Sequence, residues 1–311
     1  MPTTFLNHQQ KESKMTNTIQ PAQYALIGGS GTWGARFPED LTLPDVELVD
    51  VYQTGFATPY GQSAPFKLLR IGGELVWRVA MHGLFDWAGK LWADPWIAAK
   101  QVAWVLETAG VKWALVEGSV GGIQNPDRPG EPLPPWSVTI TDDFQMYWRP
   151  EDAQPFVAAN KRSSRLGEPF CAGLRQALLA VARQEPKFAG VYDHGVYVCS
   201  HWGRFETPAE IKAFAALGGH TVGHTLAHEA VLMRKIGVHF ASLNIVSNHA
   251  EGAAWQGYPQ SFMGAFYQEC PHAVGPVMVN ALKQVIAHGA GACRCEEYYM
   301  SGLGRLPVAG A

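Results

Sequence analysis

Charged residues are scarce in this chain of 311 residues: they make up 16% of it and leave a formal net charge of -3. So little charge provides no basic stripe for the phosphates of a nucleic acid and no polybasic patch for an anionic membrane surface. The composition therefore predicts no nucleic-acid partner and no membrane partner, and it favours a small molecule. With 47% hydrophobic residues, the chain can bury a core near the upper size for one domain.

Cysteine is also rare, and its pattern excludes a secreted disulfide framework. The five cysteines are odd in number and scattered, which is typical of a protein of the reducing cytoplasm. Cys293 and Cys295 form a C-x-C pair, but the second pair that a zinc site needs is missing nearby. We therefore interpret both as ordinary thiols and predict no metal site.

The first 22 residues lack the apolar core and the cleavage pattern of a signal peptide or a membrane anchor. They are polar, and we expect a disordered tail at residues 1–22, in which Met15 could be the natural start. Residues 23–311 contain no internal repeat and no long linker. We expect them to form a single domain.

Predicted strands and helices alternate along the rest of the chain. A buried strand over 24–27 leads into the glycine-rich residues 28–31, and a helix over 96–109 ends at Gly110. A strand over 113–116 then enters a second glycine-rich segment, 117–122, which we expect to be a turn. The remaining predicted strands span 75–80, 196–199 and 238–246. One predicted helix starts at the capping box 207–210, and another spans 227–236. This alternation predicts an α/β fold with ligands beyond the strand ends.

Gly29-x-Gly31-x-x-Gly34 follows a strand, as in a dinucleotide fingerprint. That fingerprint needs a helix to begin inside the glycine turn, so that its N–H groups face a pyrophosphate. Pro38 and Pro44 follow too closely for such a helix, so we expect no dinucleotide. Exposed backbone N–H groups and the Ser30 hydroxyl would still suit a small anion, although a tight turn alone also explains the glycines.

Several short motifs occur in a fixed order over some 220 residues. They are Ile27-Gly28-Gly29-Ser30-Gly31, Thr58-Pro59-Tyr60-Gly61, His82-Gly83, Gly118-Ser119-Val120-Gly121-Gly122, the segment 204–210 (RFETPAE), and Thr225-x-x-x-Glu229 before the strand that reaches Asn248. In this order the chain resembles the trimeric purine nucleoside phosphorylases and methylthioadenosine phosphorylases. The resemblance implies one α/β domain with a mixed, strongly twisted sheet flanked by helices, assembled as a homotrimer.

The resemblance also implies phosphorolysis of a purine nucleoside or its 5′-methylthio analogue, with phosphate as co-substrate and no cofactor. An anion under the sugar would attack C1′ as the purine leaves, and the protein would act by positioning and electrostatics. Anion contacts are implied for Ser30, His82, Ser119 (through its backbone N–H) and Thr225, and base contacts for Phe205, Glu206 and Asn248. We expect His82, His224 and Asn248 to be the catalytic residues.

The base-contacting pair has a chemical preference of its own. A 6-oxopurine presents N1–H as a donor, which the Glu206 carboxylate can accept. The amide of Asn248 can serve N7 and O6 together. Adenine-selective sites of the family carry an aspartate at the position of Asn248, so the sequence favours hypoxanthine or guanine. A helix N-terminus also favours a glutamate at position 206, and a strand end favours an asparagine at position 248, for structural reasons alone.

Two departures weaken the phosphate site. The family has an arginine directly before the histidine of His82-Gly83, where this chain has Met81, and Gly118 replaces a residue with a hydroxyl or amide. Losing a charge-assisted pair removes about 1.5–3 kcal/mol of phosphate binding. A nucleosidase that uses water, or a purine-binding protein without activity, therefore remains as an alternative.

Other departures lie where the family places the sugar and the base. His224 replaces a methionine under the ribose, and His201 and Trp202 replace a Glu-Gly pair. An imidazole there could bind sugar hydroxyls or act as a general base, and Glu117 and Glu251 are further carboxylates for the same task.

Two other features allow two interpretations each. His220, His224 and His228 are spaced like metal ligands on one helix face, but the surrounding glycines favour a strand near 220–224 and a helix only from Leu226. The tryptophan-rich segment 87–96 is either a packed loop or a lid at a subunit interface. His272 could approach the 5′ end of a nucleoside.

Overall fold

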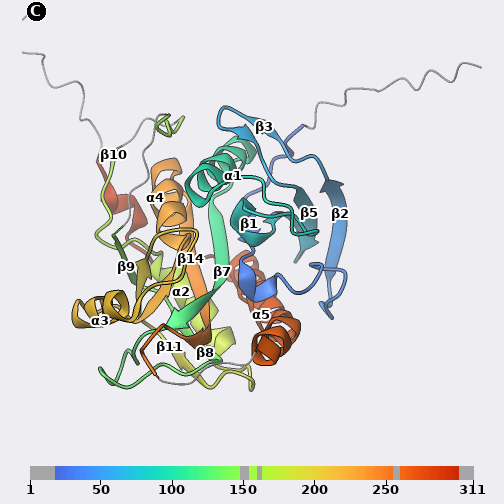
Figure 1. The fold of residues 1–311 in the computed structure, drawn as a ribbon. Coiled ribbons are helices and arrows are strands. Elements are labelled where there is room, and N and C mark those ends of the chain that lie inside the picture. Colours follow the sequence, from blue (N-terminus) through green and yellow to red (C-terminus); the bar gives the residue numbers. More distant parts are fainter. Residues whose placement is uncertain (1–17, 148–153, 160–162, 255–259, 301–311) are drawn as a thin grey trace, which may run out of the picture.

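The computed structural model describes residues 18–147, 154–159, 163–254 and 260–300, and within them one eleven-stranded sheet forms the centre (Figure 1). The main path of the sheet runs β11-β8-β14-β7-β1-β6-β5-β2, and β13, β12 and β9 extend from β7. The strands of this sheet are β1 (Tyr24–Ile27), β2 (Val46–Tyr52), β5 (Phe66–Ile71), β6 (Glu74–Val79), β7 (Trp113–Gly122), β8 (Ser137–Ile140), β9 (Asp143–Met146), β11 (Gly190–Tyr192), β12 (Val196–Cys199), β13 (Thr221–Gly223) and β14 (His239–His249).

Helices and short elements complete the fold. The helices are α1 (Pro95–Ala109), α2 (Ala172–Ala182), α3 (Pro208–Ala216), α4 (Leu226–Ile236) and α5 (Gln260–His288), with short 3-10 turns η1 (Ser30–Thr32), η2 (Met81–Gly83) and η3 (Cys295–Tyr298). Two small antiparallel sheets have two strands each: β3 (Ala57–Thr58) pairs with β4 (Gly61–Gln62), and β10 (Ser163–Ser164) pairs with β15 (Tyr299–Met300). No described helix combines the length and the hydropathy that crossing a bilayer requires.

The four central strands are parallel. β1 pairs in parallel with β6 and β7, and β7 pairs in parallel with β14, whereas β5, β2 and β8 join antiparallel. The sheet is therefore mixed, as predicted. Parallel strands place their carboxyl ends at one edge, so the segments after β1, β6, β7 and β14 converge there.

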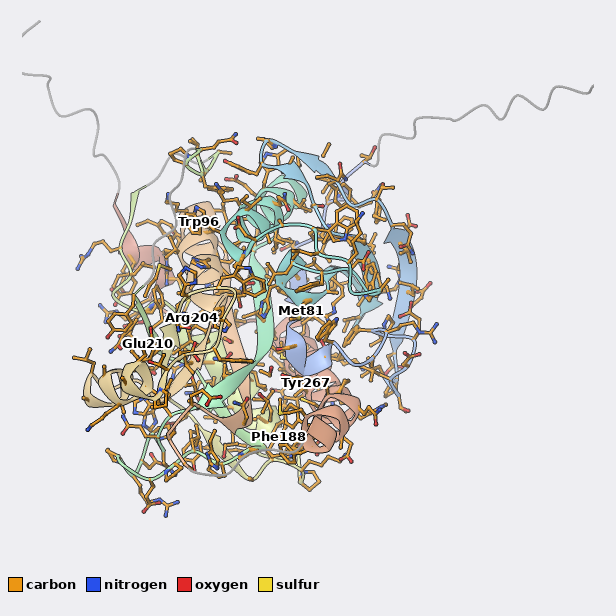
Figure 2. The ribbon with its side chains drawn as sticks, viewed as in Figure 1. Met81, Trp96, Phe188, Arg204, Glu210 and Tyr267 are labelled. Carbon is orange, nitrogen blue, oxygen red and sulfur yellow. The ribbon has the colours of Figure 1, made fainter. Side chains whose placement is uncertain are left out.

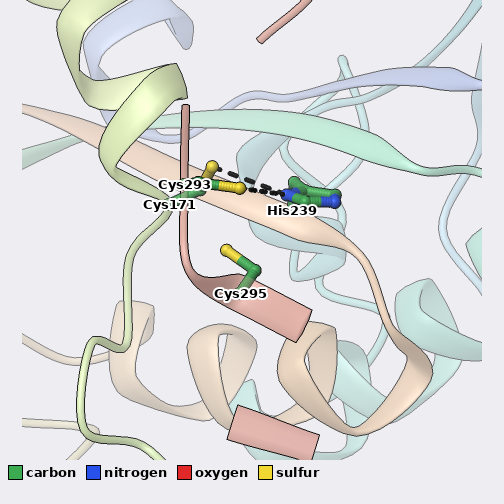
Figure 3. Close-up of side chains that lie close together, drawn as sticks. All are labelled: Cys171, His239, Cys293 and Cys295. Atoms are coloured by element: carbon green, nitrogen blue, oxygen red, sulfur yellow. Dashed lines mark hydrogen bonds between the residues drawn. The ribbon is translucent and has the colours of Figure 1, made fainter. Parts of the chain in front are cut away.

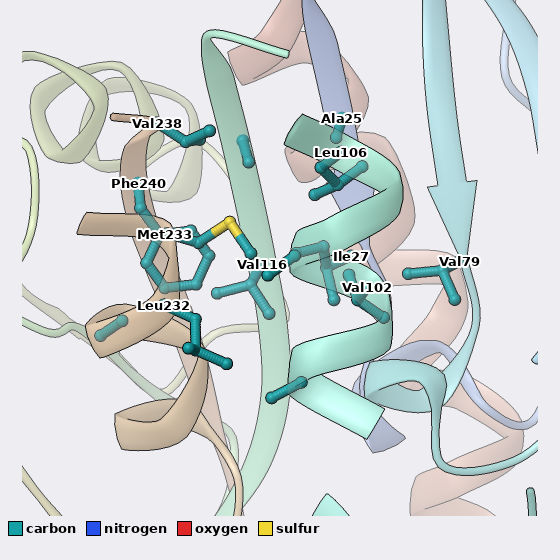
Figure 4. Close-up of a cluster of buried hydrophobic side chains, with 14 of the residues drawn as sticks. Ala25, Ile27, Val79, Val102, Leu106, Val116, Leu232, Met233, Val238 and Phe240 are labelled. Atoms are coloured by element: carbon teal, nitrogen blue, oxygen red, sulfur yellow. The ribbon is translucent and has the colours of Figure 1, made fainter. Parts of the chain in front are cut away.

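Helices cover both faces of the sheet. On one face α1 and α4 pack over the central strands, with Val102 and Leu106 of α1 and Met233 of α4 in one apolar cluster with Ile27 and Val116 (Figure 4). On the other face α2 and α5 contribute a second cluster. Burial of these side chains holds the strand ends, and hence the segments that follow them, in fixed positions.

Helix boundaries agree with the local signals. Asp94 caps α1 by accepting from the backbone N–H of Ile97, and Gly110 ends that helix with φ of 76°. The capping box of Thr207 and Glu210 begins α3, and Gly237 ends α4. The glycine turn after β1 leads into a 3-10 turn of three residues, which agrees with the expected absence of a dinucleotide-binding helix.

One local prediction is wrong. Residues 117–122 do not form a turn but continue β7 as far as Gly122, paired with β14 on one side and with β13 on the other. A Cβ at Gly122 would lie 2.3 Å from the Leu133 carbonyl oxygen, so a close crossing explains this glycine. In the segment that we expected to be a tail, the backbone of Gln20 accepts from Trp77 Nε1 and the N–H of Ala22 donates to Ala109.

Candidate active site

A cavity of about 440 Å³ lies at the carboxyl ends of the central strands. Its walls come from the segments after β1 and β6, from the ends of β7, β13 and β14, from the loop before α3, and from α5. Met81 and Tyr267 lie on one side of β7 and Arg204 on the other (Figure 2). Of the residues that the sequence singled out, Ser30, Met81, Ser119, Trp202, Phe205, Glu206, His224, Asn248 and Glu251 line this cavity. A volume of this size fits a small organic ligand.

Three hydroxyl groups meet in one part of the cavity. Ser30 Oγ and Ser119 Oγ are 2.5 Å apart, and Ser30 Oγ also accepts from the Ser119 backbone N–H at 3.1 Å. The Tyr267 hydroxyl lies 3.1 Å from Ser119 Oγ. We did not predict Tyr267 from the sequence, because it belongs to α5, far from every motif. This hydroxyl cluster can donate hydrogen bonds to an anion.

The described cavity wall has little positive charge. Its single arginine, Arg204, has its guanidinium bound to Glu210, with Nη2–Oε1 at 2.6 Å and Nη1–Oε2 at 2.8 Å. Met81, in the place of the family arginine, supplies an apolar side chain instead. An anion here would be held by hydroxyls and backbone N–H groups rather than by a direct ion pair.

His82 and Thr225 are not among the residues that line the cavity. His82 is buried, with Nδ1 2.7 Å from Glu229 Oε1, and its backbone has φ of 57°. Its ring lies between two glycines, since a Cβ at Gly29 would be 2.4 Å from Nε2 and one at Gly118 would be 3.3 Å away. Gly118 therefore gives the imidazole the space that a side chain at position 118 would occupy.

The charge of His82 depends on its acidic neighbours. Burial lowers its pKa, but the charge of Glu229, the hydrogen bond to it and the charge of Glu117 outweigh burial, so the pKa of His82 lies above its usual value. The imidazole is therefore held towards its cationic form directly behind the glycine turn.

Glu117 also lies behind the turn and not in the cavity wall. It is 1% exposed, and its Oε1 accepts from the Gly29 N–H at 2.7 Å and from Thr32 Oγ1 at 2.5 Å. Thr32 Oγ1 in turn accepts from Arg78 Nη2 at 2.7 Å. Glu117 thus fixes the turn, which is a positioning task rather than the general-base role that we considered. Arg78, a charged residue within the otherwise apolar strand predicted over 75–80, could have indicated this network from the sequence, but it was not among our predicted residues.

At another part of the cavity His224 meets two polar groups. Ser200 Oγ donates to Glu206 Oε1, and His224 Nδ1 lies 3.2 Å from Ser200 Oγ and 4.0 Å from Glu206 Oε1. Since the only hydroxyl hydrogen of Ser200 goes to the carboxylate, Nδ1 of His224 carries a proton and donates to Oγ. Burial lowers the pKa of His224 more than Glu206 raises it, which favours the neutral form of the ring. Ser200 was absent from our sequence-based set.

The other base-contacting candidates have distinct settings. Asn248 Oδ1 accepts from Ser247 Oγ at 2.7 Å, and its Nδ2 donates to the His249 carbonyl at 2.9 Å. These two bonds fix the orientation of the amide and leave it one N–H and one lone pair. Glu206 is 7% exposed, whereas Phe205 is 73% exposed at the cavity wall.

The three histidines with helical spacing are separated. His220 Nδ1 accepts from the Val196 N–H at 2.9 Å, and His228 packs on Trp96 with ring centroids 5.2 Å apart. His224, which lies between these two in the sequence, lines the cavity. Residues 221–223 form β13, which agrees with the strand expected near 220–224. His272 is not among the residues that line the cavity.

Comparison with known proteins assigns the family. Residues 23–283 match the model of the Phosphorylase superfamily. A probable S-methyl-5′-thioinosine phosphorylase of Methanothermobacter thermautotrophicus is 31% identical over 195 residues, which are 62% of this chain and 62% of that protein. The 6-oxopurine nucleoside phosphorylase of Pyrococcus furiosus is 30% identical over 235 residues, 73% of this chain and 80% of the relative.

Solved structures agree on the fold. The methylthioadenosine phosphorylase of Schistosoma mansoni in complex with tubercidin superposes with a TM-score of 0.67 at 22% identity, covering 86% of this chain and 93% of that one. The chain belongs to the Phosphorylase superfamily, in the group of purine nucleoside and methylthioadenosine phosphorylases.

Proposed function

We propose that this protein is a purine nucleoside phosphorylase that acts on 6-oxopurine nucleosides or their 5′-methylthio analogues. The observation that carries the proposal is that Glu206 and Asn248 line the same 440 Å³ cavity as the hydroxyl cluster of Ser30, Ser119 and Tyr267. One bound nucleoside could therefore reach a base-reading pair and an anion-binding group together. The relatives named as 6-oxopurine and thioinosine phosphorylases support the same substrate class.

The polar groups left open in the cavity match a 6-oxopurine. Glu206 Oε1 is engaged by Ser200, so Oε2 can accept the N1–H of hypoxanthine or guanine. Asn248 keeps one N–H for O6 and one lone pair for a protonated N7. Adenine has no N1–H at neutral pH and carries an amino group in place of O6, so it would leave both residues mismatched.

The reaction then needs no cofactor. A phosphate oxygen forms a bond to C1′ while the bond from C1′ to N9 breaks. The purine leaves with the bonding electrons and takes up at N7 a proton that balances the one lost by the attacking hydrogen phosphate. The products are the free purine and the sugar 1-phosphate. Asn248 stabilises the charge that develops on the base by accepting from N7–H, and the hydroxyl cluster orients the anion under the sugar.

A nucleosidase is the second candidate. The observation that supports it is that Arg204 is paired with Glu210, so that the described cavity wall offers phosphate no unpaired arginine. The neutral imidazole of His224, next to Ser200 and Glu206, could accept a proton from water.

The presence or absence of phosphate distinguishes these functions. Inosine, guanosine, adenosine and their 5′-methylthio forms are incubated with the pure protein with and without phosphate, and free base and sugar 1-phosphate are measured by chromatography. We expect release of hypoxanthine or guanine that requires phosphate and yields one sugar 1-phosphate per base. Equal rates without phosphate would establish hydrolysis, and calorimetric binding of hypoxanthine without turnover would establish a binding protein.

We also propose a homotrimer in the cytoplasm. Trimeric assembly is the arrangement of the class that the sequence resembles, and exposed apolar side chains near the cavity support it: Trp33 is 46% and Leu91 is 54% exposed. Leu91 bridges to Phe85, whose ring packs on Trp33, so a neighbouring subunit could cover both residues. The five thiols, none of them in a disulfide, suit a reducing compartment. Light scattering of the pure protein measures the oligomer.

A further inference from the structure

Three cysteines and one histidine meet far from the cavity. The ligand atoms Cys171 Sγ, His239 Nδ1, Cys293 Sγ and Cys295 Sγ all lie within 4.8 Å of one another (Figure 3). Nδ1 of His239 is 3.6 Å from Cys171 Sγ and 3.4 Å from Cys293 Sγ. A tetrahedral zinc ion with Zn–S of about 2.3 Å and Zn–N of about 2.0–2.1 Å requires an N···S separation of roughly 3.6 Å. The two N···S distances therefore match zinc coordination.

The backbone brings these four residues together independently of any metal. The N–H of Cys171, directly before α2, donates to the carbonyl of Phe240, the residue after His239, at 2.7 Å. Arg234 Nη1 donates to the carbonyl of Cys295 at 3.0 Å. A Cβ at Gly173 would lie 1.7 Å from the Ala290 carbonyl oxygen, so a glycine is required where the chain after α5 crosses α2. The cluster is thus preorganised.

The charge around the cluster suits a divalent cation. Three thiolates with one divalent ion carry one net negative charge, and the buried Arg234 beside them can balance it.

We propose that Cys171, His239, Cys293 and Cys295 form a structural zinc site that fastens the segment after α5 to the core. Four protein ligands close the coordination sphere, which is typical of a structural rather than a catalytic ion. His239 begins β14 and Asn248 lies near its other end, about 30 Å away at about 3.3 Å per residue. A cavity of about 540 Å³ borders Cys293 and includes Asp142, Asp143 and Glu168, which provides an entry path for a cation.

Sequence spacing could not indicate this site. Cys293 and Cys295 have no second pair nearby, and their partner His239 lies 54 residues before Cys293. Only the fold brings the ligands together, which is why we interpreted the C-x-C pair as ordinary thiols.

The test uses the whole protein, reduced, incubated with zinc sulfate and dialysed. We expect about one zinc ion per chain by mass spectrometry of the metal, and at least a tenfold loss in Cys293→Ser and His239→Ala. Cys270→Ala, which removes a buried cysteine of α5 outside the cluster, should keep the full zinc content. Removal of zinc by a chelator should lower Tm by more than about 5 °C in the wild type and leave Cys293→Ser unchanged.

Cobalt titration of the wild type keeps the proposal testable if a variant fails to fold. Tetrahedral thiolate coordination gives strong visible bands and a thiolate-to-cobalt band in the near ultraviolet, and zinc should abolish both. The proposal is overturned if the reduced protein binds neither metal, or if Cys270→Ala loses zinc as Cys293→Ser does. It is also overturned if non-reducing mass spectrometry finds a Cys171–Cys295 disulfide in protein that takes up no zinc after reduction.

Discussion

Replacing Met81 with arginine puts a cation into the part of the cavity where we propose that phosphate binds. Met81 lines the cavity beside His82, and its own backbone already has φ of 41°, so arginine adds no new backbone strain. A guanidinium–phosphate pair contributes about 1.5–3 kcal/mol, and the partial exposure of position 81 favours the lower end of that range. At about 1.4 kcal/mol per tenfold, the KM for phosphate should fall roughly 10- to 100-fold.

Initial rates against phosphate concentration at constant ionic strength measure this effect, because salt screens exposed charges. Met263→Arg is the matched control, since Met263 is another methionine of the cavity wall, on α5. We expect the control to leave the KM for phosphate within about threefold of the wild type. An unchanged KM in a folded Met81→Arg variant, or equal gains in both variants, would refute the placement of the anion at the hydroxyl cluster.

Three further substitutions test the base, the buried histidine and the sugar. Asn248→Asp should reverse the preference between 6-oxo and 6-amino purines, by up to about 10⁴-fold in the ratio of kcat/KM, and an unchanged ratio would remove Asn248 from base recognition. Because Glu229 raises the pKa of His82, phosphate affinity should fall as the pH rises through that elevated pKa. Glu229→Gln should shift this fall to lower pH. An unshifted pH profile would show that the charge of His82 does not contribute to phosphate binding. His224→Met should lower kcat/KM about tenfold or more and keep the affinity for hypoxanthine. It should also remove from the pH profile an ionisation whose pKa burial places below the usual value of about 6.5. Identical pH profiles for the variant and the wild type would make His224 a packing residue.

Signals carried by a few adjacent residues were sufficient for much of the fold. The capping box at 207–210 fixes the start of α3 because both of its hydrogen bonds are local, and Gly110 ends α1 because it can adopt a left-handed conformation. The order of the motifs also indicated which strand ends meet. Six of the eight residues named for the site line the cavity, and the two that do not are His82 and Thr225.

Long-range contacts were the part that the sequence could not supply. Gly121 and Gly122 are typical of a turn in isolation, but pairing with β13 and β14 keeps them in a strand. Tyr267 reaches Ser119 across 148 residues, and no periodicity encodes that distance. Ser200 next to Glu206 is a similar case, because its role depends on the imidazole of His224, which directly follows β13.

The buried charges behind the glycine turn explain why the loss of a cavity arginine matters. Arg78 is buried, and although burial lowers its pKa to about 10, it remains a cation at neutral pH. Glu117, linked to it through Thr32, balances that charge, and Glu229 balances a protonated His82. The two pairs together add no net charge beneath the turn. In the phosphate site that we propose, the anion would therefore be held mainly by oriented dipoles, the Ser30 and Ser119 hydroxyls and nearby N–H groups, which are individually weaker than an ion pair. We therefore expect phosphate binding to be weak because of the whole charge arrangement around the turn and not only because of Met81.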